Sequence, residues 1–240
     1  MELKLSASNP NTRQHSESAF VPGGVWDQKQ GREQTRLFAE CFHRHVKVPY
    51  QGAFSMLDVG CGLGDSIPLW RQNYPEAQLF GCDVAQVAVD RCLESYGMIG
   101  RFFRASFEEI RGNWDVIYCS NVLEHFEQHA EIANCLLSLC RILYVMTPYA
   151  ETRDGKPLTP ESGEFHVATL DKMTFSTLER SGKASVTAKV VRAPGAWSPN
   201  WKGELKWALR RAFLQTKDRP PRQIIYAITN RAVGGHRQAE

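Results

Sequence analysis

Short apolar runs alternate with amphipathic segments along most of the chain. The apolar runs are typical of strands that are buried on both faces of a sheet. The amphipathic segments repeat their apolar positions at helical spacing, as Leu37, Phe38 and Cys41 do. The predicted strands are 54–59, 77–84, 100–106, 114–121, 141–148, 184–192 and 222–229. The predicted helices are 30–46, 65–74, 85–96, 127–140, 171–182 and 200–215.

This alternation predicts an α/β fold with a Rossmann-like, doubly wound sheet of seven strands, mostly parallel and with an antiparallel edge strand. The last two strands, 184–192 and 222–229, are separated by a helix and supply that edge. Such sheets bind ligands beyond the carboxyl ends of their strands. We therefore expect the glycine-rich turn after 54–59 to meet Asp83 and Asn121, because each follows a strand.

The domain plan and the cellular location follow from the polar ends and the cysteines. Residues 1–25 are polar and are expected to be flexible, and residues 26–240 are expected to form one domain. The N-terminus lacks the apolar stretch of a secretory signal, and no run approaches the roughly 20 apolar residues of a membrane span. The seven cysteines form no CxxC pair, so we expect reduced thiols, no bound metal and a cytoplasmic protein.

Charge is distributed unevenly along the chain. Residues 176–240 hold 13 Lys and Arg against 4 Asp and Glu, whereas residues 1–175 hold 16 against 22. A basic, tryptophan-rich segment, 197–222, lies between the last two strands and is treated as an insertion in the domain. It is compatible with an anionic partner such as nucleic acid, with a membrane surface, or with a helix that packs its tryptophans on the body.

The glycine-rich turn LDVGCGLGD, residues 57–65, exposes backbone between a strand and a helix. Two ligand classes use such a turn, dinucleotides and S-adenosylmethionine. The dinucleotide fingerprint G-x-G-x-x-G fails here, because Asp65 stands at its third position. A carboxylate there competes with a pyrophosphate for the helix N-terminus, which argues against a nicotinamide-dependent oxidoreductase. A zwitterionic sulfonium ligand meets no such conflict.

Four motifs in order resemble those of class I S-adenosylmethionine-dependent methyltransferases, in the subgroup that includes small-molecule and glycan methyltransferases. They are LDVGCGLGD (57–65), LFGCDVA (79–85), RASFEEI (104–110) and WDVIYCSNVLEHF (114–126). The resemblance implies that Asp58 holds the amino-acid end of the cofactor, Asp83 binds the ribose hydroxyls and Asn121 faces the methionine. The cofactor residues that it implies are Trp26, Gln34, Thr35, Asp58, Gly60, Cys61, Gly62, Gly64, Asp83, Val84, Ala105, Ser106, Phe107, Asn121 and Val122.

Methyl transfer from a sulfonium mainly requires alignment of the acceptor and exclusion of water. A base is needed only when the acceptor is a hydroxyl or a protonated amine. His166 and His125 are the candidate catalytic residues, with Glu164 as a further candidate. The family often carries an adjacent Glu/His pair in the loop after the fifth strand, whereas Phe165 separates the two here. An N-terminal helix that carries Gln34 and Thr35 is expected to act as a lid.

Several functions stay open from the sequence. The preferred one is methyl transfer to an oxygen or nitrogen of a phosphosugar or surface-glycan precursor, with a tRNA acceptor next. A different class is a binding module for nucleic acid or protein that keeps the fold without turnover. The intact glycine turn and Asp83 argue against that module.

Overall fold

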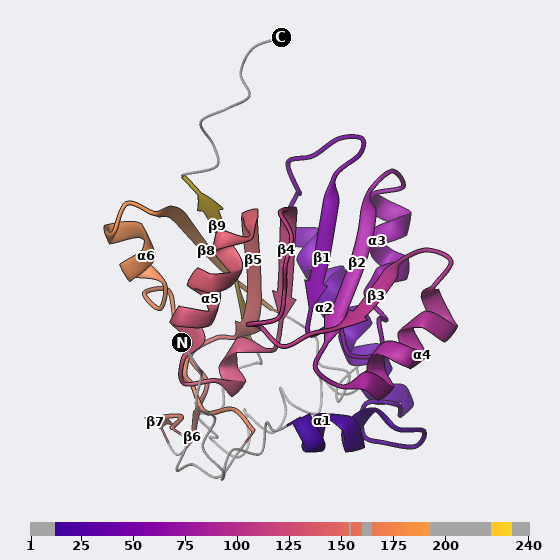
Figure 1. Ribbon diagram of the computed structural model, residues 1–240. Coiled ribbons are helices and arrows are strands. Elements are labelled where there is room, and N and C mark those ends of the chain that lie inside the picture. Colours follow the sequence, from indigo (N-terminus) through magenta and orange to yellow (C-terminus); the bar gives the residue numbers. More distant parts are fainter. Residues whose placement is uncertain (1–12, 154, 160–164, 193–221, 232–240) are drawn as a thin grey trace.

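The computed structural model describes residues 13–153, 155–159, 165–192 and 222–231 (Figure 1). Helices flank a central sheet of seven strands in the order β3-β2-β1-β4-β5-β9-β8. The strands of this sheet are β1 (Ser55–Val59), β2 (Gln78–Asp83), β3 (Arg101–Arg104), β4 (Trp114–Ser120), β5 (Cys140–Pro148), β8 (Ala184–Arg192) and β9 (Arg222–Asn230). The helices are α1 (Arg13–Phe20), α2 (Lys29–His45), α3 (Ile67–Asn73), α4 (Gln86–Tyr96), the 3-10 helix η1 (Leu123–His125), α5 (His129–Ser138) and α6 (Ser176–Arg180). Strands β6 (Thr152–Arg153) and β7 (Lys156–Pro157) form a separate hairpin.

The strand order reverses between β1 and β4. From β1 the chain passes outward through β2 and β3, then returns to β4 and continues to β5, with all these pairs parallel. Ligands of such sheets bind where the order reverses, beyond the carboxyl ends of the strands. In Figure 1 the hairpin β6–β7 and helix α1 lie beyond that end of the sheet. The predicted α/β fold with seven mostly parallel strands is confirmed.

The antiparallel strand is β9, which pairs with both β5 and β8. It therefore lies one place in from the edge, and the outermost strand β8 runs in the same direction as β5. Burial accounts for this order. Strand β9 carries a nearly continuous buried run from Gln223 to Tyr226, whereas most residues of β8 are partly or fully exposed, as suits an edge.

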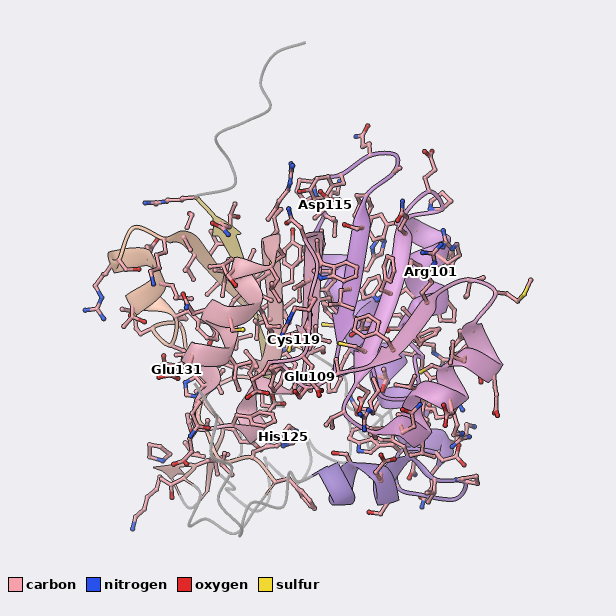
Figure 2. All side chains as sticks on the ribbon, in the orientation of Figure 1. Arg101, Glu109, Asp115, Cys119, His125 and Glu131 are labelled. Carbon is pink, nitrogen blue, oxygen red and sulfur yellow. The ribbon has the colours of Figure 1, made fainter. Side chains whose placement is uncertain are left out.

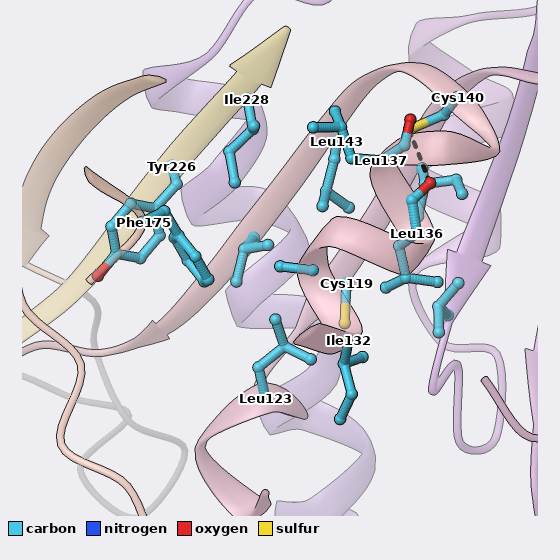
Figure 3. Close-up of a cluster of buried hydrophobic side chains, with 14 of the residues drawn as sticks. Cys119, Leu123, Ile132, Leu136, Leu137, Cys140, Leu143, Phe175, Tyr226 and Ile228 are labelled. Carbon is cyan, nitrogen blue, oxygen red and sulfur yellow. Dashed lines mark hydrogen bonds between the residues drawn. The ribbon is translucent and has the colours of Figure 1, made fainter. Parts of the chain in front are cut away.

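The core lies on both faces of the sheet, because neighbouring strand residues point to opposite sides. Leu57 and Ile117 pack with α5 and α6 on one face, where Figure 3 shows the side chains of Leu136 and Phe175. On the other face, aromatic side chains of α2, α3 and β4 pack edge to face; they are Phe42, Trp70 and Tyr118. All seven cysteines are free thiols, and six of them are buried.

Helix α6 is shorter than the predicted 171–182. The Asp171 carboxylate accepts the amide of Met173 at 2.8 Å, and the Thr174 hydroxyl accepts the amide of Asp171 at 2.8 Å. Such local side-chain bonds compete with helical ones and delay the helix to Ser176. The segment ends at Gly182, whose φ of +73° suits a residue without a side chain.

The polar N-terminal segment contains a helix. Part of the region predicted to be flexible, residues 13–20, forms α1, which contacts α4. The Glu17 carboxylate accepts the amides of Gln86 and Val87 at 2.9 and 3.1 Å and so caps the start of α4. The predicted helix 200–215 and almost all of the insertion 197–222 lie outside the described residues. Within the described ranges, no helix combines the length and the apolar character that crossing a membrane requires.

Candidate functional site

The glycine turn after β1 brings three elements into close contact. Gly60, Gly62 and Gly64 have φ of +72°, +52° and +75°, a region that L side chains rarely adopt. A Cβ on Gly60 would lie 2.5 Å from Cγ2 of Val122, and one on Gly62 would lie 3.1 Å from the ring of Phe20. The turn therefore needs residues without side chains. Gly60 lies against the segment after β4, and Gly62 lies against α1.

Asp58 lies in β1 beside this turn and is only 4% exposed. The Ser66 hydroxyl donates a short hydrogen bond to its Oδ2. Burial raises the pKa of the Asp58 carboxyl to about 7, and the charge of Asp83 adds to this, while Ser66 and Trp70 oppose it. A cationic ligand group beside this carboxyl would therefore favour its charged form.

Asp83 ends β2 and faces the same turn. Its Oδ2 accepts the amide of Gly62 at 3.0 Å and its Oδ1 accepts the amide of Ala85 at 2.9 Å. Burial raises the pKa of Asp83, and its backbone amide donors oppose the shift. Each carboxylate oxygen has a second lone pair, so Asp83 can still accept two hydroxyl donors.

The segments after β3 and β4 lie at the same carboxyl end of the sheet as the glycine turn. The Ala105 amide donates to the Asp83 carbonyl at 3.0 Å. The Ser106 amide and hydroxyl donate to Glu109 and Glu108 at 2.8 and 3.0 Å. Asn121 has a φ of +54°, and its amide donates to the Met146 carbonyl at 2.7 Å. Half-buried side chains at this edge are Val84, Ser106, Phe107, Asn121 and Val122; Cys61 and Gly64 are buried.

The predicted lid residues lie on and before α2. Gln34 is buried, Thr35 is half-buried and Trp26 is 37% exposed. The start of α2 is fixed to the glycine turn by Arg32, whose guanidinium donates to Asp65 at 2.8 Å. The side chain that lies against Gly62 is that of Phe20 from α1, which no sequence pattern indicated.

The two predicted catalytic histidines lie together beyond the carboxyl ends of the strands, where Figure 2 labels His125. The rings of His125 and His166 have centroids 4.9 Å apart. Nδ1 of His166 lies 2.6 Å from Oε2 of Glu151, and Nδ1 of His125 lies 2.8 Å from the carbonyl oxygen of Phe165. Because η1 starts two residues after Asn121, this cluster lies at the same carboxyl end of the sheet as Asn121. Glu164 is outside the described residues.

Glu124 belongs to the same cluster and was not proposed as a site residue from the sequence. It is 1% exposed, and its Oε2 accepts the hydroxyl of Thr147 at 3.0 Å. Its backbone carbonyl accepts the amides of Val167 and Ala168 at 2.8 and 3.1 Å, which fixes the His166 loop on η1. Glu124 could have been predicted as a site residue because it directly precedes His125 in the sequence. The pairing of Glu151 with His166 has no signal in the sequence.

Comparison with known proteins identifies this arrangement. A family model described as a methyltransferase domain matches residues 56–144, which extend from β1 into β5. Residues 56–144 are thus a methyltransferase domain. The match includes the glycine turn, Asp83 and η1, and it confirms the predicted family, for which S-adenosylmethionine is the methyl donor.

Solved structures share the fold of this methyltransferase domain at low sequence identity. The plantazolicin methyltransferase BpumL, solved with S-adenosylhomocysteine, is 19% identical with a TM-score of 0.58, over 91% of this chain and 95% of its own. Geranyl diphosphate C-methyltransferase from Streptomyces coelicolor A3(2) is 10% identical with a TM-score of 0.62, over 95% and 100%. Magnesium protoporphyrin IX methyltransferase from Synechocystis PCC 6803 is 15% identical with a TM-score of 0.54, over 83% of each chain.

Proposed function

We propose that this protein transfers the methyl group of S-adenosylmethionine to an oxygen or nitrogen of a small-molecule acceptor. The observation that carries the proposal is the arrangement of Asp58, the bare glycine turn and Asp83 at the point where the strand order reverses. The domain match and the S-adenosylhomocysteine bound by the three structural neighbours described above support the choice of cofactor.

Each part of the cofactor has a matching group in the chain. S-adenosylmethionine, when bound, supplies a methyl on a positively charged sulfur, which keeps the bonding electrons as the acceptor atom takes the methyl. Asp58 would hold the ammonium of the amino-acid end, in its charged form. Asp83 would accept the ribose hydroxyls through the lone pairs that its backbone donors leave available. Phe20, from α1, would help to exclude water from the glycine turn.

The acceptor side is polar and suits a group that loses a proton. His125, His166 and Glu151 lie beyond the carboxyl end of the sheet, together with the buried Glu124. A hydroxyl or amine acceptor needs such groups and a carboxylate acceptor does not. A phosphosugar or surface-glycan precursor remains the proposed class, since it carries hydroxyls and an anionic group that the basic C-terminal quarter would attract. A tRNA acceptor is the alternative on the same charge.

Calorimetric titration with S-adenosylhomocysteine tests the cofactor site. The full chain is expected to bind it, and Asp83→Asn is expected to weaken binding about 10- to 100-fold, the range for a charge-assisted hydrogen bond. Asp90→Asn is the matched control: Asp90 lies on α4, is exposed and accepts from Gln86 at 2.8 Å. Urea unfolding of each variant identifies a loss of stability. A folded wild-type chain that does not bind at millimolar concentration refutes the proposal.

The acceptor is sought with labelled S-adenosylmethionine and fractionated extract. Label in a sugar-containing fraction supports the proposed class, label in RNA supports the alternative, and label in a lipid or another metabolite replaces both. Salt-dependent RNA binding without incorporation of label would instead indicate a binding module.

A further inference from the structure

Three side chains at the acceptor side converge as metal ligands do. A carboxylate oxygen of Glu124 and one ring nitrogen each of His125 and His166 all lie within 4.8 Å of one another. Metal–ligand bonds to such atoms are about 2.0–2.2 Å, so three ligands in a tetrahedral arrangement lie about 3.4 Å apart. A side-chain adjustment of roughly 1 Å would bring the three atoms to that spacing.

Hydrogen bonds at Nδ1 set the tautomer of both imidazoles. The Phe165 carbonyl can only accept, so Nδ1 of His125 carries the proton and its lone pair lies on Nε2. The Glu151 carboxylate accepts from Nδ1 of His166 in the same way, at 2.6 Å. A ligating histidine typically donates its other ring N–H to a carboxylate or carbonyl, which orients the ring and raises its basicity. Both histidines here have such a partner.

The buried carboxylate provides an independent indication. Glu124 is 1% exposed, and its Oε2 is bonded to Thr147. Its Oε1 is buried and has no hydrogen-bond partner among the described residues. A buried carboxylate oxygen without a partner is costly. A cation at the cluster would satisfy it, which gives Glu124 a reason to be buried beside two histidines.

We propose that Glu124, His125 and His166 bind a divalent first-row transition ion, with Glu151 as the group that orients His166. Two imidazoles and one carboxylate suit zinc, iron or manganese better than magnesium, which prefers an all-oxygen shell. Three protein ligands leave positions open on the ion. This site replaces the sequence-based expectation of no metal, which considered only cysteine spacing.

The site also narrows the acceptor, in a step that rests on the proposed function. An ion at this place offers open positions to oxygen atoms of the acceptor, and a bound cation lowers the pKa of a hydroxyl that it holds. The acceptor class is therefore a molecule with a hydroxyl next to a second oxygen donor, such as a vicinal diol or a hydroxyl beside a carboxylate or phosphate. With the ion bound, the histidines act as its ligands in place of the role of base considered above, and the hydroxyl held by the ion would lose its proton to solvent water.

Metal titration of the full chain tests the site. After dialysis against EDTA, the protein is titrated with Mn²⁺ by calorimetry and with Co²⁺ by visible absorption, and Mg²⁺ serves as the comparison ion. We expect one Mn²⁺ site and a Co²⁺ spectrum without thiolate charge-transfer bands. His166→Gln is expected to weaken Mn²⁺ binding by at least about 100-fold and Glu151→Gln by about 10-fold, the lower end for an orienting partner.

Matched controls separate the site from general damage. His129→Gln changes a histidine on neighbouring α5 whose Nδ1 lies 3.1 Å from the Phe126 carbonyl, and it should leave Mn²⁺ affinity unchanged. S-adenosylhomocysteine binding by His166→Gln should persist, so failure of the metal site is distinguishable from failure of the cofactor site. His166 lies on a half-buried loop, which makes this variant safer for folding than Glu124→Gln.

Three results overturn the proposal. The first is that the wild-type chain binds neither Mn²⁺ nor Co²⁺ at 1 mM, a concentration about 10³ times the dissociation constant of a micromolar site. The second is an equal Mn²⁺ affinity in wild type and His166→Gln. The third is a Co²⁺ spectrum with thiolate bands. The last would move the ion to the cysteines.

Discussion

Replacement of Gly60 by alanine tests the tight contact between the glycine turn and the segment after β4. Two costs are expected. The φ of +72° strains any L residue by about 1–2 kcal/mol. The new Cβ would also lie 2.5 Å from Cγ2 of Val122, and overpacking of this kind costs about 1–3 kcal/mol. The free energy of unfolding should therefore fall by about 2–5 kcal/mol.

Gly182→Ala isolates the first cost. Gly182 has a φ of +73°, and a Cβ there would have no atom within 4 Å, so only the backbone strain should appear. Val122→Ala removes the clashing methyl. In the double variant with Gly60→Ala, most of the unfolding free energy that is lost through overpacking should therefore be recovered. Urea unfolding followed by circular dichroism gives the four free energies. Equal losses for Gly60→Ala and Gly182→Ala, or no recovery in the double variant, would refute the contact.

Two further predictions concern charge. Burial raises the folded pKa of Asp58 from 3.8 to about 7, so the folded state binds more protons than the unfolded state between these values. The stability that this group contributes is present below about pH 4 and is lost as the pH rises to about 7. The free energy of unfolding of wild type, relative to that of Asp58→Asn, should therefore fall over that window. A difference that does not change with pH would contradict the raised pKa. Glu17→Gln should lower the unfolding free energy by about 0.3–1 kcal/mol, because Glu17 caps α4 with a negative charge; Glu94→Gln, exposed on the same helix, should change it less.

The central strands and the glycine turn could be predicted because their signals are local. The run SMLDV is apolar and is followed by glycines, and the observed β1 ends one residue before Gly60. The match of β2 and β4 to the predicted strands has the same origin. The position of β9 between β5 and β8 could not be predicted. It depends on the burial of β9 relative to that of β8, which the sequence of neither strand specifies by itself.

The candidate site was only partly visible in the sequence for the same reason. Asp58 and Asp83 follow from the motif resemblance, and the structure brings both to the glycine turn. The cluster with His166 needs a loop that returns 41 positions later in sequence to η1, held by amide bonds to the Glu124 carbonyl. Phe20 lies in a polar segment without a strong pattern, so its position on Gly62 depends on tertiary packing.

Strand β9 lies between β5 and β8, although it comes last of the three along the chain. During synthesis, which adds residues from the N-terminus, the β5 edge must wait until residues 222–230 leave the ribosome. An exposed strand edge is a template for pairing with another molecule. The nascent chain is therefore most vulnerable to misassociation between the emergence of β5 and that of β9, and slow translation of residues 193–221 would lengthen that interval.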